Sequence, residues 1–351
     1  MISCMIRCPT CGSEDCIRPA EDVLAASAVM YAPCGSCAAE PPLDKLMPFS
    51  GLGIEPGRDA GRCRSCGKRH LDTVMAHVLG VLVRHGLKSD TTPLKDSGTP
   101  LIVYGVGLAE PPRLGSRDLV VLLDEVNREA AAAILAEVPE VKGVLRRTGG
   151  PKKSVGLRDT REKPHVYELL AGCDMRADVV SSLLGDMVFY RSQSLMHVEF
   201  WRSGSVKVQL LENMFLEGAL EGKVVVDGFA SAGTLGLLAA GAGARKVVLN
   251  DAWLPAIRNI LVNIEANRAS LGAELELVTP PDGLPRVSAR PTLVARASGR
   301  AEIEVYHADF RALRDVVGPC DVCIIDTFPG VKSDEFAELW KGRVKGRLLV
   351  L

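Results

Sequence analysis

The most constraining feature of the sequence is the run VVVDGFASAGT at positions 224–234. Its three successive valines are typical of a strand buried on both faces, as strands of parallel sheets are. Small residues follow directly, and Gly228 and Gly233 let a backbone pass where a Cβ would collide. A strand, a tight turn and a helix in this order predict a binding loop at the carboxyl end of a parallel strand.

Strands and helices alternate after this run. The pattern predicts further strands at 246–249, 302–307, 321–325 and 347–351, with helices at 254–268 and 333–340. Alternation of this kind is typical of a doubly wound parallel sheet, so the fold class is α/β and this part is Rossmann-like.

Five parallel strands would leave the fifth one unpaired on its outer side, and exposed sheet edges are normally covered. We therefore expect the middle of the chain, or a second copy in a homodimer, to cover the edge at 348–351. The apolar runs 275–278 and 292–294 are expected to form an extra hairpin beside the third strand.

Acidic residues stand directly after three of the predicted strands, so that Asp227, Asp251 and Asp309 would meet at one edge of the sheet. The absence of a GxGxxG pattern favours a nucleoside with an amino-acid tail over a dinucleotide. Asp227 is expected to bind the ammonium of the tail, Asp251 the ribose hydroxyls and Asp309 the adenine amino group. Each aspartate alone is equally explained as a helix cap or turn residue, so the prediction depends on their convergence. The predicted ligand-binding residues are Asp227, Gly228, Phe229, Ala230, Ser231, Gly233, Thr234, Asn250, Asp251, Asp309 and Phe310.

The fourth predicted strand ends in Asp326 and Thr327, followed by Phe-Pro-Gly. A polar residue before an aromatic residue and a proline suits a rigid loop that holds an acceptor atom, and the Asp326 carboxylate could remove a proton from that atom. Asp326, Thr327 and Pro329 are therefore the candidate catalytic residues. An ordinary strand-ending turn explains the same residues, and this motif alone favours the turn.

Cysteines gather near the start of the sequence, where eight of the 11 lie within the first 66 residues. No apolar signal segment precedes them, and no apolar run reaches the roughly 20 residues that cross a membrane. We therefore expect a cytoplasmic protein with reduced thiols. Three CxxC pairs, each with a nearby glycine, predict one or two zinc ions bound by thiolates, because eight thiolates are enough for two sites of four. His70 could replace a cysteine, and an iron–sulfur cluster is the competing interpretation. The spacing leaves the pairing open among the candidate ligands Cys4, Cys8, Cys11, Cys16, Cys34, Cys37, Cys63 and Cys66.

These patterns divide the chain into three parts. Positions 1–75 form a cysteine-rich, zinc-ribbon-like unit, 76–215 a middle α/β domain that could bind substrate, and 216–351 the Rossmann-like domain. With a net charge of −1, the chain as a whole is no electrostatic binder of nucleic acid, so RNA binding would need a local patch. The segment from Lys142 to Lys163 is rich in lysine and arginine and suits a phosphate backbone, although a solvated loop explains its charges equally well.

Several of these residues resemble the archaeal and eukaryotic tRNA guanine-37 N-1 methyltransferases and their wybutosine-synthesis relatives, which are class I S-adenosylmethionine-dependent methyltransferases. EVPEVKGVLRRTGG at 137–150 is similar to the family's P-x-V-K-x-V-L-R-K segment, and ELLAG at 168–172 to the segment after it. The resemblance covers about residues 118–345. It implies S-adenosyl-L-methionine as cofactor, with 227–233 on the methionine side, Asp251 at the ribose and Asp309 at the adenine.

The resemblance implies methyl transfer to a tRNA base of the guanine N-1 type, but the sequence departs from the family in three places. Thr327, with Asp326 beside it, stands where the family has asparagine, the usual closing strands are missing, and the cysteine-rich start is extra. The altered loop leaves methylation of a protein side chain or a small metabolite as an alternative. The missing strands leave a non-catalytic RNA- or protein-binding module on a degenerate methyltransferase fold as another.

Overall fold

The computed structural model describes residues 7–38, 43–108, 110–147, 167–196, 205–327 and 331–351. The chain divides into two compact units. One consists of Met1–Leu24, Arg158–Lys163 and Ala177–Leu351, and is called the sheet unit below. The other consists of Ala25–Leu157 and Pro164–Arg176, and is called the cysteine unit. Each is described by itself, and the three-part domain division expected from the sequence stays a prediction.

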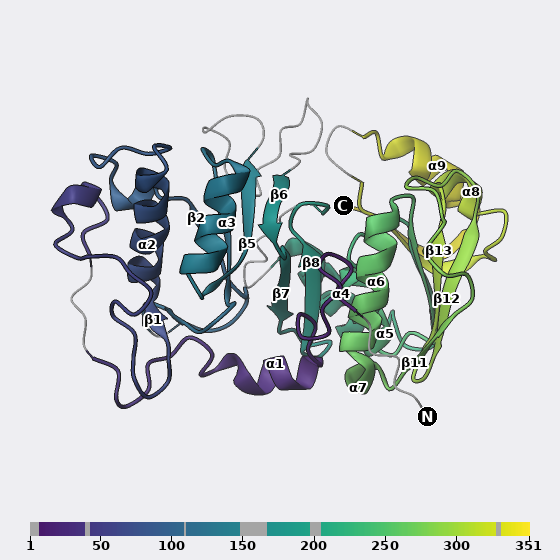
Figure 1. The fold of residues 1–351 in the computed structure, drawn as a ribbon. Coiled ribbons are helices and arrows are strands. Elements are labelled where there is room, and N and C mark those ends of the chain that lie inside the picture. The colour runs from purple at the N-terminus through teal and green to yellow at the C-terminus, as the bar shows by residue number, and fades with distance from the viewer. Residues whose placement is uncertain (1–6, 39–42, 109, 148–166, 197–204, 328–330) are drawn as a thin grey trace. The chain divides into compact units, whose positions relative to one another are not determined.

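The cysteine unit is built around a four-stranded sheet with the order β2-β4-β5-β6. Only β4 and β5 are parallel, and the other two pairs are antiparallel. The side chain of Asn127 begins α3 by accepting a hydrogen bond from the Ala130 amide, and α2 and α3 pack side by side (Figure 1). Its elements are η1 (Phe49–Gly51), β1 (Arg69–His70), α2 (Leu71–Arg84), η2 (Leu94–Asp96), β2 (Thr99–Leu101), β3 (Arg113–Leu114), β4 (Leu119–Leu123), α3 (Arg128–Glu137), β5 (Val141–Arg147) and β6 (Tyr167–Gly172), and α1 (Ala20–Ser27) joins the two units in sequence.

The sheet unit holds a seven-stranded sheet with the order β11-β12-β13-β10-β9-β14-β15. Its five strands from β13 to β15 run parallel, which confirms the α/β class and the doubly wound sheet expected from the sequence. The hairpin expected beside the third strand is also confirmed, because β11 and β12 are antiparallel and β12 pairs with β13. The strands are β9 (Val224–Asp227), β10 (Lys246–Asp251), β11 (Glu274–Leu277), β12 (Thr292–Ser298), β13 (Glu302–His307), β14 (Cys320–Ile325) and β15 (Val344–Val350).

Helices cover both faces of this sheet, and alternate strand residues serve the two faces. Val225 and Val247 belong to one core with α4, α5 and α6, whereas Val226 and Val248 belong to a second core with α8 and α9 (Figure 1). The helices are α4 (Val206–Leu216), α5 (Thr234–Gly241), α6 (Leu254–Ala266), α7 (Arg268–Leu271), α8 (Phe310–Leu313) and α9 (Asp334–Lys341).

The outer edge of β15 pairs with no strand in the part of the chain that the structure describes. Leu349 and Leu351 are partly buried against the core, whereas the Val350 side chain is 45% exposed. The cover expected over this edge, whether from the middle of the chain or from a second copy, therefore stays a prediction. Among the described helices, none combines the length and apolar character that a membrane span requires.

β8 (Met187–Ser192) pairs with β7 (Met175–Val180). Two asparagines on α6 and a third directly after it take the place of a second partner strand for β8. The side chains of Asn267, Asn263 and Asn259 accept hydrogen bonds from the amides of every second β8 residue: Val188, Tyr190 and Ser192. Four residues of helix rise about 6 Å and two of strand about 6.7 Å, so the two repeats match. We call these three residues the asparagine ladder, and it fixes the end of β8 to the Rossmann-like core.

Asn263 is the central rung, is fully buried and also binds the ligand-loop backbone. Its side chain accepts from the Tyr190 amide at 2.6 Å and donates to the carbonyls of Tyr190 at 3.0 Å and Ala232 at 2.8 Å. Replacing Asn263 by Ala should lower the free energy of unfolding by about 2–4 kcal/mol, because buried polar groups lose their partners. Urea unfolding followed by tryptophan fluorescence measures this in the sheet unit, where all three tryptophans lie. Asn213→Ala, at an exposed site on α4, is the matched control, and equal stability of the two variants would contradict the ladder's role.

Candidate functional site

The strand order brings the predicted ligand residues together at one edge of the sheet. β9 lies between β10 and β14 in the sheet. The chain continues from β9 to β10 on one side and from β14 to β15 on the other, so the connections after β9 and β14 run in opposite directions. A crevice opens at such a switch point, outside the carboxyl ends of the strands. Asp227 and Asp251 end β9 and β10, and Asp326 directly follows β14. The sequence predicted such a convergence for Asp227, Asp251 and Asp309, and their binding of one ligand stays a prediction.

The loop after β9 is held in one conformation by close packing and backbone hydrogen bonds. A Cβ on Gly228 would lie 2.3 Å from Cε2 of Phe310, so only glycine fits this position. The Gly228 amide donates to the carbonyl of Ile324 and the Ala230 amide to that of Asn250. Ser231 has a φ of 52°, which is unusual for a residue with a side chain and is typical of constrained loops at binding sites.

Asp227 is buried, and only one of its two carboxylate oxygens has a hydrogen-bond partner among the described residues. Its Oδ2 accepts a hydrogen bond from the Gly236 amide at 3.0 Å, at the start of α5. Its Oδ1 is buried and has no hydrogen-bond partner within the described residues. Burial raises the pKa of Asp227 to about 7, and repulsion from the Asp326 carboxylate adds to the shift. A buried acceptor without a partner is costly, so the site is chemically incomplete without a donor, and a cation would suit it best.

Asp251 joins the ligand loop to the start of α6. Its carboxylate accepts hydrogen bonds from the Ser231 amide at 3.0 Å and the Trp253 amide at 2.9 Å. Burial raises the pKa of Asp251 to about 6, although the hydrogen bonds from these two amides lower it. Each oxygen keeps a further lone pair. The turn role that the sequence left open is thus present, and the ribose contact stays a prediction.

Two other predicted ligand residues have structural partners. The Asn250 amide nitrogen donates to the carbonyls of Gly228 at 3.0 Å and Ala308 at 3.2 Å, which ties three strand ends together. Thr234 accepts a hydrogen bond from the buried Arg191 guanidinium at 2.9 Å. Sequence reasoning missed Arg191, because nothing local to β8 marks it as a neighbour of a loop 43 residues away.

Asp309 and Phe310 begin α8. The Asp309 carboxylate accepts from the Arg311 amide and forms an ion pair with the Arg311 guanidinium at 2.7 Å, which lowers the pKa of Asp309. Its role as helix cap is therefore present, while its adenine contact stays a prediction. Phe310 is 2% exposed and stacks on Trp340 with ring centroids 4.6 Å apart. With Phe229 and Phe336, these rings form an aromatic core directly beneath Gly228.

Of the candidate catalytic residues, the structure describes two. Asp326 lies at the crevice and forms an ion pair with Lys207 of α4, with 2.5 Å between Nζ and Oδ2. Thr327 is buried, and its hydroxyl lies 3.4 Å from the Val331 carbonyl. Pro329 lies outside the described residues.

One group of four cysteines lies entirely in the cysteine unit. The thiols of Cys34, Cys37, Cys63 and Cys66 lie within 4.8 Å of one another and could hold a metal ion. Three of the sulfur pairs are 3.7 Å apart. The Cys66 and Ser65 amides donate to the Cys63 sulfur and lower the pKa of its thiol to about 6, the direction that favours a thiolate ligand. The sequence left open which CxxC pairs share a site, and the structure brings the pair Cys34 and Cys37 together with the pair Cys63 and Cys66.

This group is anchored by a buried ion pair. The Arg69 guanidinium is fully buried and binds Glu140 through two hydrogen bonds, of 2.9 and 2.5 Å. Arg62, next to Cys63, binds the same carboxylate at 2.8 Å and donates to the Gly67 carbonyl at 2.6 Å. Glu140 directly precedes β5, so the turn that carries Cys63 and Cys66 is fixed to the sheet.

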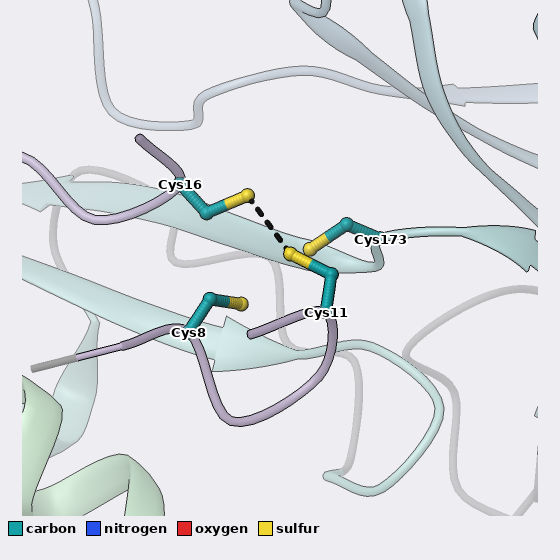
Figure 2. A group of neighbouring side chains, drawn as sticks. All are labelled: Cys8, Cys11, Cys16 and Cys173. Atoms are coloured by element: carbon teal, nitrogen blue, oxygen red, sulfur yellow. Dashed lines mark hydrogen bonds between the residues drawn. The ribbon is translucent and has the colours of Figure 1, made fainter. Parts of the chain in front are cut away.

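A second group comprises Cys8, Cys11 and Cys16 of the sheet unit, whose thiols lie within 4.8 Å of one another (Figure 2). The turn at Cys8 has the same hydrogen bonds as that at Cys63: the first cysteine's amide donates five residues ahead, and a positive-φ glycine donates back to it. Cys4 lies outside the described residues.

The basic segment from Lys142 to Lys163 is described only up to Arg147. Within that part, Arg146 forms an ion pair with Glu168, and Arg147 one with Asp124 at 3.1 Å. Each of these two charges has an acidic partner in the same unit. Lys142 is also described, whereas the basic residues from Lys152 on lie outside the described residues.

No protein-family model matches the chain, and a search of curated proteins also finds no match. The chain is similar to several solved structures. The tRNA m1G37 methyltransferase of Methanocaldococcus jannaschii is 14% identical, with 79% of this chain and 64% of that one covered and a TM-score of 0.38. TYW2 of Pyrococcus horikoshii, in complex with MeSAdo, is 17% identical, with 79% and 78% covered and a TM-score of 0.40. Trm5b of Pyrococcus abyssi is 16% identical, with 65% and 56% covered and a TM-score of 0.35.

The chain thus spans 56% of the length of Trm5b and 64% of the length of the m1G37 enzyme. Similarity at these identities and TM-scores assigns neither an activity nor a substrate to this chain. A function has to be argued from the residues at the crevice.

Proposed function

We propose that this protein is an S-adenosyl-L-methionine-dependent methyltransferase that acts on a tRNA base, most simply a guanine nitrogen. The observation that carries the proposal is the Oδ1 atom of Asp227, a buried acceptor without a partner beside a loop that only glycine can form at Gly228. The sequence resemblance supports a tRNA base as the substrate, and the residues at the strand ends support S-adenosyl-L-methionine as the cofactor.

The residues at the crevice suit a ligand with an amino-acid end and a nucleoside end. Asp227 would accept hydrogen bonds from the ammonium of the amino-acid end, since a charged donor best satisfies a buried carboxylate. Asp251 ends the neighbouring strand and would accept from the ribose hydroxyls with its remaining lone pairs. Asp309 or its backbone would lie at the adenine.

S-adenosyl-L-methionine supplies a methyl group on a sulfonium, which is an electrophile without further activation. The protein's part is to hold the acceptor in line and to take its proton. A guanine nitrogen is a poor nucleophile until that proton is lost. Asp326, which directly follows β14, would take this proton, and Thr327 and Pro329 would shape the loop that holds the acceptor.

One observation favours a different acceptor, a protein side chain or a small metabolite. Arg146 and Arg147, the described arginines of the basic segment, are paired with acids and lack the excess positive charge that attracts phosphates. The chemistry at Asp227 and Asp326 would be the same.

We also propose two four-thiolate sites that each bind one zinc ion, one made by Cys34, Cys37, Cys63 and Cys66 and the other including Cys8, Cys11 and Cys16. The thiols of each set lie close together, and the turns at Cys8 and Cys63 share the same backbone hydrogen bonds. Tetrahedral coordination by four thiolates is the usual form of a structural zinc site. Such an ion would stabilise a segment that carries few large apolar residues.

Ligand binding should release a proton from Asp227. Its pKa of about 7 in the free protein means that the carboxyl is mostly protonated at pH 6, whereas the ammonium requires the ionised form. Affinity for S-adenosylhomocysteine should therefore fall roughly tenfold for each pH unit below about 7 and level off above it. Calorimetry in two buffers of different ionisation enthalpy measures both affinity and released protons. Asp227→Asn should lose most of this pH dependence, and Asp282→Asn, at a side chain that is 95% exposed, should keep it. A flat profile in the wild type would contradict the assignment.

The acceptor is tested by transfer of labelled methyl groups to bulk tRNA from cells that lack the protein. The wild type should label tRNA, and Asp326→Asn should lower kcat by roughly 10²- to 10⁴-fold, the range for loss of a general base. Its affinity for S-adenosylhomocysteine should stay within about twofold. Asp315→Asn, at a side chain that is 73% exposed, is the control. Labelling of proteins or metabolites instead of tRNA would identify the alternative acceptor, and ligand binding without any labelling would indicate a non-catalytic module.

Elemental analysis of protein purified without added metal should find two zinc ions per chain. Cys37→Ser and Cys11→Ser should each release one ion to a chromogenic chelator, and the double variant both, because each change removes one of four thiolates from a different group. Stoichiometric iron and sulfide would show that the sites hold clusters, and full zinc in the double variant would place the metal elsewhere.

A further inference from the structure

Lys207 and Asp326 form an ion pair directly after β14. The Lys207 ammonium lies 2.5 Å from Oδ2 of Asp326, and the two residues are 119 positions apart. Lys207 stands in the first turn of α4, a helix that precedes the ligand loop in the sequence. Both side chains are mostly buried, with 24% and 17% of their surfaces exposed, so water screens the pair only in part.

The second oxygen of Asp326 is in the opposite situation. Oδ1 is buried and has no hydrogen-bond partner among the residues that the structure describes. One carboxylate thus has an oxygen bound to a cation and another, buried, without a hydrogen-bond partner among the described residues. This division is what a proton acceptor needs: a fixed orientation and an unoccupied lone pair.

Asp326 also lies near a second buried carboxylate, that of Asp227, and the two repel each other. This repulsion adds to burial in raising the pKa of Asp227. Only an ionised carboxylate can accept a proton. Among the described residues, the charged groups placed at Asp326 are Lys207 from α4 and Asp227 from the end of β9. Lys207 is the cation that offsets the repulsion.

We propose that Lys207 is a positioning residue that keeps Asp326 ionised and turns its Oδ1 toward the acceptor nitrogen of the methyl transfer. This assignment rests on the proposed function. In the step it serves, the N–H bond of the acceptor breaks and an O–H bond forms at Oδ1. The electron pair left on the nitrogen is then available as the nucleophile, and no oxidation or reduction takes place.

The test compares Lys207→Met and Lys207→Arg with Lys341→Met, a control at a side chain that is 71% exposed. Titration of carboxyl carbons by NMR in ¹³C-aspartate-labelled full-length protein, with the Asp326 signal assigned by its loss in Asp326→Asn, follows protonation without any substrate. Lys207→Met should move the Asp326 midpoint up by about one pH unit or more, because an opposite charge within hydrogen-bond distance is removed. Lys207→Arg should restore it.

The second readout is the pH profile of kcat with bulk tRNA, which a purely structural ion pair would leave in place. In Lys207→Met, the acidic limb should shift to higher pH by the amount that NMR finds, so that kcat at pH 6.5 falls about tenfold or more. KM for S-adenosyl-L-methionine and the affinity for S-adenosylhomocysteine should stay within about twofold.

The outcomes separate the two proposals. Wild-type protein that binds no S-adenosylhomocysteine would overturn the proposed function and this assignment with it. Normal ligand binding with an unchanged Asp326 titration in Lys207→Met would overturn the role of Lys207 alone. A shifted titration with an unchanged kcat profile would also overturn it, because the ion pair would then be structural.

Discussion

The position of β9 between β10 and β14 is the constraint on which the rest of the site depends. It brings the ends of neighbouring parallel strands to one edge, and with them the carboxylates of Asp227, Asp251 and Asp326. Three acidic groups in a partly buried crevice repel one another, which is unfavourable for the empty protein. Burial is the main cause of the raised pKa values of Asp227 and Asp251, and repulsion from the other two carboxylates adds to the shift of Asp227. A ligand that brings positive charge and hydroxyl donors would relieve it, so the site favours binding over stability.

The parts around the crevice maintain this arrangement by satisfying backbone groups with side chains. Asn250 ties the ends of three strands, and the asparagine ladder replaces a missing strand beside β8. Asn263 serves both, since it also holds the carbonyl of Ala232 in the ligand loop. Below the loop, the Phe310 ring occupies the space that any side chain at position 228 would need. Lys207 contributes the one cation that contacts Asp326 among the described residues. Local chemistry and sheet topology are therefore coupled.

Much of this could be predicted from the sequence, where a period or a spacing carries the information. Three valines and a glycine turn predicted β9 and its loop, and two apolar runs predicted the hairpin of β11 and β12. Residues whose role depends on distant partners could not be predicted. Lys207 of α4 contacts Asp326, 119 positions away, and the Arg311 guanidinium binds the Asp309 carboxylate. A single sequence shows the type of each residue but not its partner across the fold.

The central claim is that the Asp227 carboxylate holds the ammonium of an amino-acid tail. The most direct test is a thermodynamic cycle that measures the affinities of wild type and Asp227→Asn for S-adenosylhomocysteine and for its analogue without the amino group. The account predicts that removing the amino group weakens binding to the wild type by roughly 10- to 100-fold, as expected for a charge-assisted hydrogen bond, and weakens binding to the variant only slightly. Equal losses in both proteins would show that Asp227 and the ammonium do not interact, and would contradict the account.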